Sequence, residues 1–576
     1  MKKLRKLSAL FLALVMALSM SMTAFAATLT VDSSKVVTNT ETVTISGIPA
    51  DASVSFSTFQ VVYATYDSDS NSLEFHLTDW AEAVLVNADE NTRTAYQYAT
   101  EEEAIAALSG ITTTGKSTTE QSDLVNALAS YAAATDNSVP SYNATWTVAD
   151  VQAGAETTSA TATLPVGSYI VLPASSTMAF LNMLVSVDVS DTTESGSTAK
   201  NGWVLTAKGA VLKGTELTIG KVVSDDGNTY GDTAEVQVGS TVSYTVTATV
   251  PKFAANSTNI KFKVVDTPEN LAIDVSSVKV YGVDANGGKT ELGSSAYTAG
   301  LDSAGVVLTV DFSANYLTTF YNATNGAYPY ESVEITYDAE VLSSAVVSTG
   351  NENEVELIFG NNTNPESTAD TDTTTVYTYE LDLSKLGKDD TPLSNASFKI
   401  YTNAEKTSPL TFIKNSDGTY AVADSTDIAD DTVTKYDAIT TGNDGTLVLT
   451  GLDGSATYYI EESVAPSGYT LNTNYLAFTI TGATDAEGNF TGQIKSVSST
   501  EYDSNDAQVS TGSWTCTVKT EDDVNTASIE LTLTDTQIIE LPSTGGSGTI
   551  LFTIVGCVVM IAAAGLYMSY RRRVQR

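Results

Sequence analysis

The chain has 576 residues, of which 28 are Lys or Arg and 69 are Asp or Glu, so its formal net charge is −41. This charge argues against nucleic acid as a partner, because phosphate backbones repel so acidic a surface. One histidine and two cysteines are too few for a Ser-His-Asp triad, a Cys-His pair or a His-rich zinc site, so the composition disfavours a conventional enzyme and predicts no cofactor and no metal.

The chain begins with a typical export signal. Basic residues stand at positions 2, 3, 5 and 6, an apolar run extends from 7 to 20, and small residues occupy positions 24 and 26. This order indicates a secretory signal peptide over residues 1–26. We therefore expect the rest of the chain to be exported.

Residues 27–212 are expected to form an N-terminal domain that is mixed but rich in β-structure and carries short helices. The segments 100–109 and 118–134 have helical spacing. Thr100 and Glu103 have the form of a capping box, which would start the first of these helices.

From about residue 213 onward the pattern is that of short strands separated by turns. Between 242 and 250, apolar and polar residues alternate with a period of two, which is typical of a strand with one buried face. Because the polar segment 361–375 resembles a domain boundary, we place a middle domain at 213–366 and a C-terminal domain at 372–540. The sequence thus predicts a mostly β protein of tandem Ig-like β-sandwiches.

Three features follow one another at the C-terminal end, residues 541–576. An apolar stretch at 550–570 is long enough to span a bilayer, and three arginines follow it at once. The stretch is preceded by the pentapeptide Leu541, Pro542, Ser543, Thr544 and Gly545. This order resembles the LPXTG cell-wall sorting signal of Gram-positive surface proteins.

The resemblance to a sorting signal implies a partner and a location. A sortase cysteine would attack the carbonyl of Thr544, release the segment that begins at Gly545, and pass the acyl group to an amine. We therefore expect a protein that is linked to peptidoglycan at the cell surface. Its contact with the membrane would be made only through the C-terminal helix, before cleavage.

The C-terminal domain resembles the Cna B-type module. Lys385 lies in its first strand, residues 458–469 resemble the family's E-box, and Asp535 lies in its last strand. In that family a lysine, a last-strand Asn or Asp and a glutamate form an intramolecular isopeptide bond. The resemblance implies a bond between Lys385 and Asp535, promoted by Glu462.

The middle domain resembles the Cna A-type domain of pilus backbone subunits, in which an aspartate replaces the glutamate. The resemblance implies a bond between Lys221 and Asn361, promoted by Asp266. Strand parity gives a test from the residues alone, since residues i and i+2 share one face of a strand. All six residues fall on the apolar parity of their strands.

The chemistry of these residue types fits self-crosslinking. Burial disfavours charge, so a lysine amine can become a neutral nucleophile and a nearby carboxyl can stay protonated. Proximity in a folded core then replaces chemical activation of the acyl group. The alternative for each trio is a buried salt bridge that never reacts.

The remaining element is the amine that would accept the acyl group of Thr544. Residues from Trp203 to Lys213 partly resemble the pilin motif of Gram-positive pilus backbones, which ends in a lysine. Lys213 is therefore the predicted linking residue, and Lys208 is the alternative. A solvated lysine near a domain junction is the plainer interpretation of either residue.

The sequence as a whole resembles the major subunit of a sortase-assembled pilus with a role in adhesion. Its implied partners are sortase, other copies of the chain, peptidoglycan, minor tip or basal pilins, and a host receptor that the sequence does not identify. A monomeric sortase-anchored adhesin would share every feature except a working linking lysine. A wall-anchored enzyme is disfavoured, because no catalytic cluster stands outside the crosslinking trios.

Overall fold

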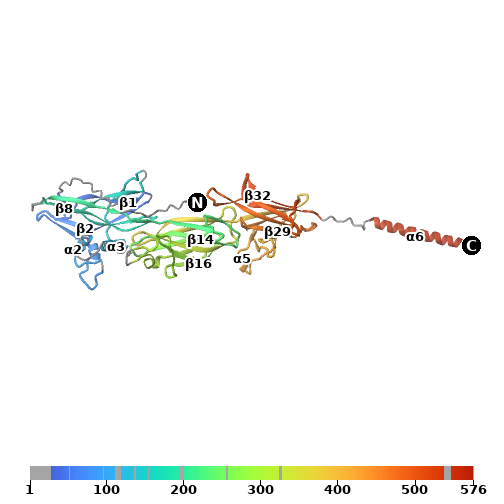
Figure 1. The fold of residues 1–576 in the computed structure, drawn as a ribbon, viewed down its shortest axis with the longest axis horizontal. Coiled ribbons are helices and arrows are strands. Elements are labelled where there is room, and N and C mark those ends of the chain that lie inside the picture. The colour runs from blue at the N-terminus through green and yellow to red at the C-terminus, as the bar shows by residue number, and fades with distance from the viewer. Residues whose placement is uncertain are drawn as a thin grey trace. The chain divides into compact units, whose positions relative to one another are not determined.

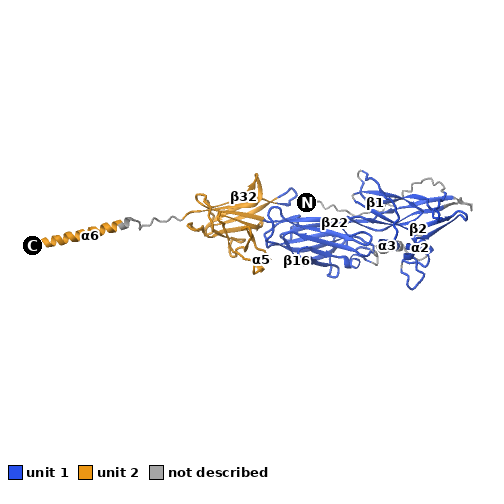
Figure 2. Cartoon of the chain, turned by 180° about the vertical axis from the view of Figure 1, so that it is seen from behind, with its two compact units in different colours: residues 1–378, 484–491 blue, residues 379–483, 492–576 orange. Residues whose placement is uncertain are grey.

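The computed structural model describes residues 28–50, 52–94, 96–109, 119–134, 138–152, 155–193, 200–254, 257–322, 327–537 and 547–574 (Figure 1). The chain divides into two compact units, which Figure 2 shows in different colours. Unit 1 comprises residues 1–378 and 484–491, and unit 2 comprises residues 379–483 and 492–576. The predicted signal peptide and the pentapeptide at 541–545 lie outside the described residues.

The N-terminal part of unit 1 contains two larger sheets and a strand pair among the described residues. The first sheet has the order β3-β2-β6-β8-β9 and is formed by β2 (Ser55–Asp67), β3 (Ser72–Leu77), β6 (Gly167–Ala174), β8 (Met183–Thr193) and β9 (Lys200–Lys208). The second has the order β10-β1-β5-β4 and is formed by β1 (Thr40–Pro49), β4 (Thr147–Val148), β5 (Thr157–Pro165) and β10 (Ala210–Val211). The pair consists of β7 (Met178–Phe180) and β11 (Gly214–Glu216).

Three helices pack against one face of the first sheet, and they are α1 (Asp79–Leu85), α2 (Glu101–Leu108) and α3 (Thr119–Ala133). Helices α2 and α3 confirm the two predicted helical segments. The Thr100 side chain accepts a hydrogen bond from the Glu103 backbone, so it caps α2 as expected. Helix α1 was not predicted, because only seven residues carry its pattern.

The middle part of unit 1 is a β-sandwich. One sheet has the order β12-β14-β20-β16-β17, with β12 (Ile219–Ser224), β14 (Thr241–Thr249), β16 (Leu271–Val283), β17 (Lys289–Glu291) and β20 (Ser332–Val341). The other has the order β13-β22-β21-β15-β19-β18, with β13 (Thr233–Glu235), β15 (Lys261–Pro268), β18 (Thr298–Leu301), β19 (Leu308–Asp311), β21 (Asn351–Gly360) and β22 (Ser367–Tyr377). Two short helical turns, η1 (Ser313–Asn315) and α4 (Tyr316–Phe320), follow β19.

The segment 361–375 does not separate two domains, contrary to our expectation. Most of it belongs to β22, which pairs with β21 from Asn351↔Val376 to Phe359↔Ser367. The sequence did not reveal this strand, because it has few apolar residues and only on part of one face. Its Thr and Asp residues resemble those of a linker. Strand β22 therefore completes the middle sandwich, and unit 2 begins at Tyr379.

Unit 2 contains a second sandwich. One sheet has the order β25-β26-β28-β23-β33-β32, with β23 (Tyr379–Gly387), β25 (Phe412–Lys414), β26 (Tyr420–Val422), β28 (Thr446–Leu452), β32 (Trp514–Glu521) and β33 (Val524–Asp535). The other has the order β27-β24-β29-β30-β31, with β24 (Ser397–Tyr401), β27 (Ile439–Thr440), β29 (Thr457–Val464), β30 (Tyr475–Thr484) and β31 (Phe490–Tyr502). A short helix, α5 (Ser425–Ala429), follows β26.

A single long helix, α6 (Ser547–Val574), ends the described chain. Its segment Leu551–Val574 is long and apolar enough to cross a membrane. Arg571, Arg572 and Arg573 lie in its last turn. This arrangement agrees with the apolar stretch and basic tail expected from the sequence.

Candidate functional site

The core of the unit 2 sandwich contains a lysine and two carboxyl groups. Lys385 lies on β23 and Asp535 ends β33, and these strands are parallel neighbours with Lys385 opposite Leu533. Glu462 comes from β29 in the facing sheet. Lys385 Nζ lies 3.1 Å from Glu462 Oε1 and also contacts Asp535 Oδ1. The three predicted residues are therefore brought together.

Water does not reach this cluster. The side chains of Lys385 and Glu462 are fully buried, and that of Asp535 is 2% exposed. Burial raises the pKa of Glu462 and the pKa of Asp535, because a carboxylate loses its hydration in such a core. A backbone N–H from Asn472 also donates to Glu462 Oε2 at 2.8 Å, which fixes the glutamate's orientation.

A second cluster lies in the core of the middle sandwich. Lys221 of β12 and Asp266 of β15 come from facing sheets, and Lys221 Nζ lies 2.6 Å from Asp266 Oδ2. Their side chains are 0% and 2% exposed. The ammonium group also lies 5.0 Å from the ring centre of Tyr244 and 5.8 Å from that of Tyr337.

Burial dominates the electrostatics of Lys221. It lowers the pKa of this amine to about 8, although Asp266 acts in the opposite direction. A large share of the amine is therefore neutral at mildly alkaline pH. A neutral amine has the lone pair that attack on a carbonyl requires.

Asn361 does not belong to this second cluster, contrary to the sequence-based prediction. It lies just beyond the end of β21, where its Oδ1 accepts hydrogen bonds from the backbones of Thr363 and Asn364. Val355 is the β21 residue opposite Asp266, so Asn361 lies six residues further, or about 20 Å along the strand. Asn361 therefore organises a turn at the strand's end.

Asn353 is the asparagine that shares contacts with the cluster. It lies on β21 two residues before Val355, is fully buried, and its Nδ2 donates to the Tyr337 hydroxyl at 3.1 Å. The same hydroxyl donates to Asp266 Oδ2 at 2.6 Å. Parity could not separate Asn353 from Asn361, because both fall on the apolar face. Only the pairing of β15 with β21 distinguishes them.

Both candidates for the linking lysine are exposed. Lys213 lies between β10 and β11, and its carbonyl accepts a hydrogen bond from the Leu181 backbone. Lys208, at the end of β9, forms an ion pair with Asp188 at 2.5 Å. Trp203 is buried in the N-terminal core and packs edge-on against Tyr66. Trp203 thus anchors the strand that leads toward the two lysines.

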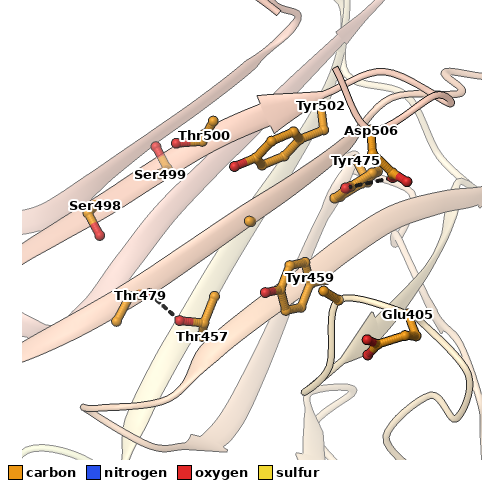
Figure 3. A pocket seen from close by; sticks show the side chains of 12 residues that line it. Glu405, Thr457, Tyr459, Tyr475, Thr479, Ser498, Ser499, Thr500, Tyr502 and Asp506 are labelled. Carbon is orange, nitrogen blue, oxygen red and sulfur yellow. Dashed lines mark hydrogen bonds between the residues drawn. The ribbon is translucent and has the colours of Figure 1, made fainter. Parts of the chain in front are cut away.

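A groove of about 590 Å³ lies on the outer face of β29, β30 and β31 (Figure 3). Two pairs of its polar groups bond to each other, since the Tyr475 hydroxyl donates to Asp506 and the Thr457 and Thr479 hydroxyls share a hydrogen bond. Lys406 Nζ covers the Tyr475 ring at 3.8 Å. The groove is therefore less suited to chemistry than the two buried clusters.

Comparisons with known proteins agree with this architecture. Residues 379–493 match the model of a prealbumin-like fold domain, and residues 534–575 match that of the LPXTG cell wall anchor motif. The trypsin-resistant surface T6 protein of Streptococcus pyogenes serotype M6 is 26% identical over 391 residues, which are 58% of this chain and 65% of that protein.

Among solved structures, the T6 backbone pilin of S. pyogenes serotype M6, which has a modular three-domain structure, shares the fold. The alignment covers 89% of this chain and 100% of the T6 pilin chain, at 17% identity and a TM-score of 0.52. The major pilin SpaD from Corynebacterium diphtheriae aligns with 66% of this chain and 79% of its own, at 19% identity and a TM-score of 0.37. The chain is a cell-wall-anchored surface protein of the Gram-positive type, and its fold is similar to that of the T6 backbone pilin.

Proposed function

We propose that the chain is the repeating structural subunit of a covalent pilus, stabilised by one intramolecular isopeptide bond in each of its two sandwich domains. The observation that carries this proposal is the full burial of Lys221 and Lys385, each in contact with a carboxyl group. Leaving such charges in a core without reaction costs desolvation energy and seldom gives a net gain. Self-crosslinking converts them into neutral amides.

In the C-terminal domain the new bond joins Lys385 Nζ to Asp535 Cγ. The neutral amine attacks the protonated Asp535 carboxyl, and one oxygen leaves as water. Glu462 takes part as the acid that polarises the carbonyl, a role that fits its raised pKa and its contact with Lys385. No external activation is needed, because the fold holds the reacting groups in contact.

In the middle domain the bond joins Lys221 Nζ to Asn353 Cγ, and ammonia leaves. Asp266 takes the proton of the lysine, to which it is hydrogen bonded at 2.6 Å. Asn353 replaces Asn361 as the acyl donor in this proposal, because Asn353 shares the Tyr337 hydroxyl with Asp266.

Such bonds suit a protein that bears tension. In the C-terminal domain, a pull that enters at Tyr379 reaches Lys385 within the first strand and crosses directly to Asp535 at the end of the last. The 149 residues between them (535 − 385 − 1) are then bypassed. The sandwich can hold its fold while force passes through a covalent path.

Between subunits, sortase would transfer the acyl group of Thr544 to a lysine of the next copy. Lys213 is the proposed acceptor, since it is exposed and is not in an ion pair with any described residue. Lys208 stays the alternative, although Asp188 holds its amine. The last subunit would be joined to peptidoglycan, and adhesion to a host receptor or assembly with minor pilins would follow from surface display.

Intact mass tests the internal bonds. The mature protein is expected to be lighter than its sequence by about 35 Da, the sum of ammonia and water lost in the two acyl transfers. Asn353→Ala should remove about 17 Da of this deficit, whereas Asn361→Ala, the matched control, should retain it. The assignment is wrong if the two variants behave in the opposite way.

Surface extracts boiled in SDS test the polymer. The wild-type chain should give a ladder of covalent multimers, and Thr544→Ala should give none. Lys213→Ala should abolish the ladder while Lys208→Ala preserves it. A single band from the wild-type chain, still anchored to the wall, would instead favour a monomeric adhesin.

A further inference from the structure

The hydroxyl of Tyr337 lies between two of the groups that the middle-domain reaction uses. It donates to Asp266 Oδ2 at 2.6 Å and accepts from Asn353 Nδ2 at 3.1 Å. A hydroxyl has one proton, so donation to the carboxylate leaves only its lone pairs for the amide. This arrangement fixes the orientation of the Asn353 amide, with nitrogen toward Tyr337.

The position of Tyr337 is rigid and dry. Tyr337 pairs with Tyr244 across β20 and β14, and the two rings stack at 5.1 Å with an angle of 19° between their planes. Tyr337 is 2% exposed. Burial, first of all, and Asp266 raise the pKa of Tyr337 well above its ordinary value, so the hydroxyl keeps its proton.

Two buried acceptors in this cluster have no hydrogen-bond partner among the described residues. They are Asp266 Oδ1 and Asn353 Oδ1. The buried Tyr244 hydroxyl is also without a partner among the described residues. Transfer of the lysine proton to Asp266 would add a further donor to the cluster.

We propose that Tyr337 is a catalytic residue of the middle-domain crosslink, in which it relays a proton from Asp266 to the departing nitrogen of Asn353. The inference rests on the isopeptide bond proposed above. An amide nitrogen leaves poorly unless it is protonated, and the Tyr337 hydroxyl is in hydrogen-bond contact with Asn353 Nδ2.

The proposed reaction begins with proton transfer within the ion pair. Lys221 gives one proton to Asp266, and its neutral Nζ then bonds to Asn353 Cγ to form a tetrahedral intermediate. Tyr337 passes its hydroxyl proton to Nδ2 and recovers the first lysine proton from Asp266, the bond from Cγ to Nδ2 breaks, and ammonia departs. Nζ gives its second proton to the Asp266 carboxylate as it becomes the amide N–H, so Asp266 ends protonated.

Rates of crosslinking test this role. The full chain can be made in a short cell-free pulse, quenched with acid at intervals, digested, and analysed by mass spectrometry for the peptide that links Lys221 to Asn353. Tyr337→Phe keeps the ring stack and removes only the hydroxyl. We expect it to slow bond formation about 10²-fold, the lower end of the range for general acid catalysis.

Two controls separate this role from a structural one. Tyr458→Phe removes another buried tyrosine hydroxyl, which accepts from the Asp453 backbone at 2.8 Å, and it should leave the middle-domain rate unchanged. The unfolding of Asn353→Ala should also be compared with that of Asn353→Ala combined with Tyr337→Phe. Equal stability shows that the hydroxyl is not needed for the fold.

The outcomes are distinct. If the wild-type chain forms no link, the proposed isopeptide bond is wrong. If the wild-type chain forms the link and Tyr337→Phe forms it equally fast, the bond stands and the relay is overturned. Slow linking in Tyr337→Phe, with stability equal in the paired variants, supports the relay.

Discussion

Replacing Asp535 by alanine should remove the proposed C-terminal crosslink and still leave Lys385 with a carboxyl partner. Lys385 keeps Glu462 as a partner at 3.1 Å, so no unpaired charge is left in the core. The bond would close a loop of 150 residues (535 − 385), which by the chain-entropy relation for crosslinks stabilises the fold by about 5 kcal/mol. For a domain of about 160 residues this corresponds to a fall in Tm of about 10–20 °C.

Asp535→Asn is the matched control for this prediction. It also removes the carboxylate, but its amide can still acylate Lys385, with loss of ammonia in place of water. Differential scanning calorimetry of the three proteins, each checked by intact mass, should show Asp535→Asn melting near the wild type and Asp535→Ala far below. If a wild-type protein with the full mass deficit melts within about 3 °C of Asp535→Ala, the entropic argument fails.

Three further outcomes are expected. In Asn353→Ala, which cannot crosslink, the free energy of unfolding measured in urea should rise between about pH 8 and 10.5. The reason is that the folded state lowers the pKa of Lys221 from 10.5 to about 8, so unfolding takes up a proton in this range. A free energy that does not change with pH would contradict this. In the same uncrosslinked protein, Asp372→Ala should lower the free energy of unfolding by about 1.5–3 kcal/mol, because Asp372 accepts a hydrogen bond from the Lys221 backbone at the open edge of β12. Urea titration measures this loss, and an unchanged midpoint would count against it. Thr100→Ala should lower the free energy of unfolding by about 1 kcal/mol, because helix α2 loses its N-terminal cap. Calorimetry of the N-terminal transition should reveal this loss, and Thr100→Ser should melt close to the wild type.

Much of the C-terminal site could be predicted from the sequence. Lys385, Glu462 and Asp535 each continue an apolar alternation, and period two alone places them on inward faces. The two sorting features that lie in α6, an apolar span and an arginine cluster, were likewise readable from hydropathy and charge.

The middle site was predicted only in part. Lys221 and Asp266 were identified, but residues 351, 353, 355, 357, 359 and 361 all share one parity, so alternation gives no reason to prefer one asparagine. Tyr337 was not singled out, because a tyrosine on an apolar face is usually a packing residue. We expected the segment 361–375 to be a domain boundary, since its Thr and Asp residues suit both a loop and an exposed strand.

The sequence by itself determined that the chain is exported and anchored, and which face of the recognised strands is buried, because these features depend on composition and on a local period of two. The tertiary structure alone decided which residues meet across sheets. Contact between distant strands depends on their register, and a shift in register moves a side chain by about 3.3 Å per residue. That pairing brings Asn353 to the Tyr337 hydroxyl and leaves Asn361 at the end of its strand.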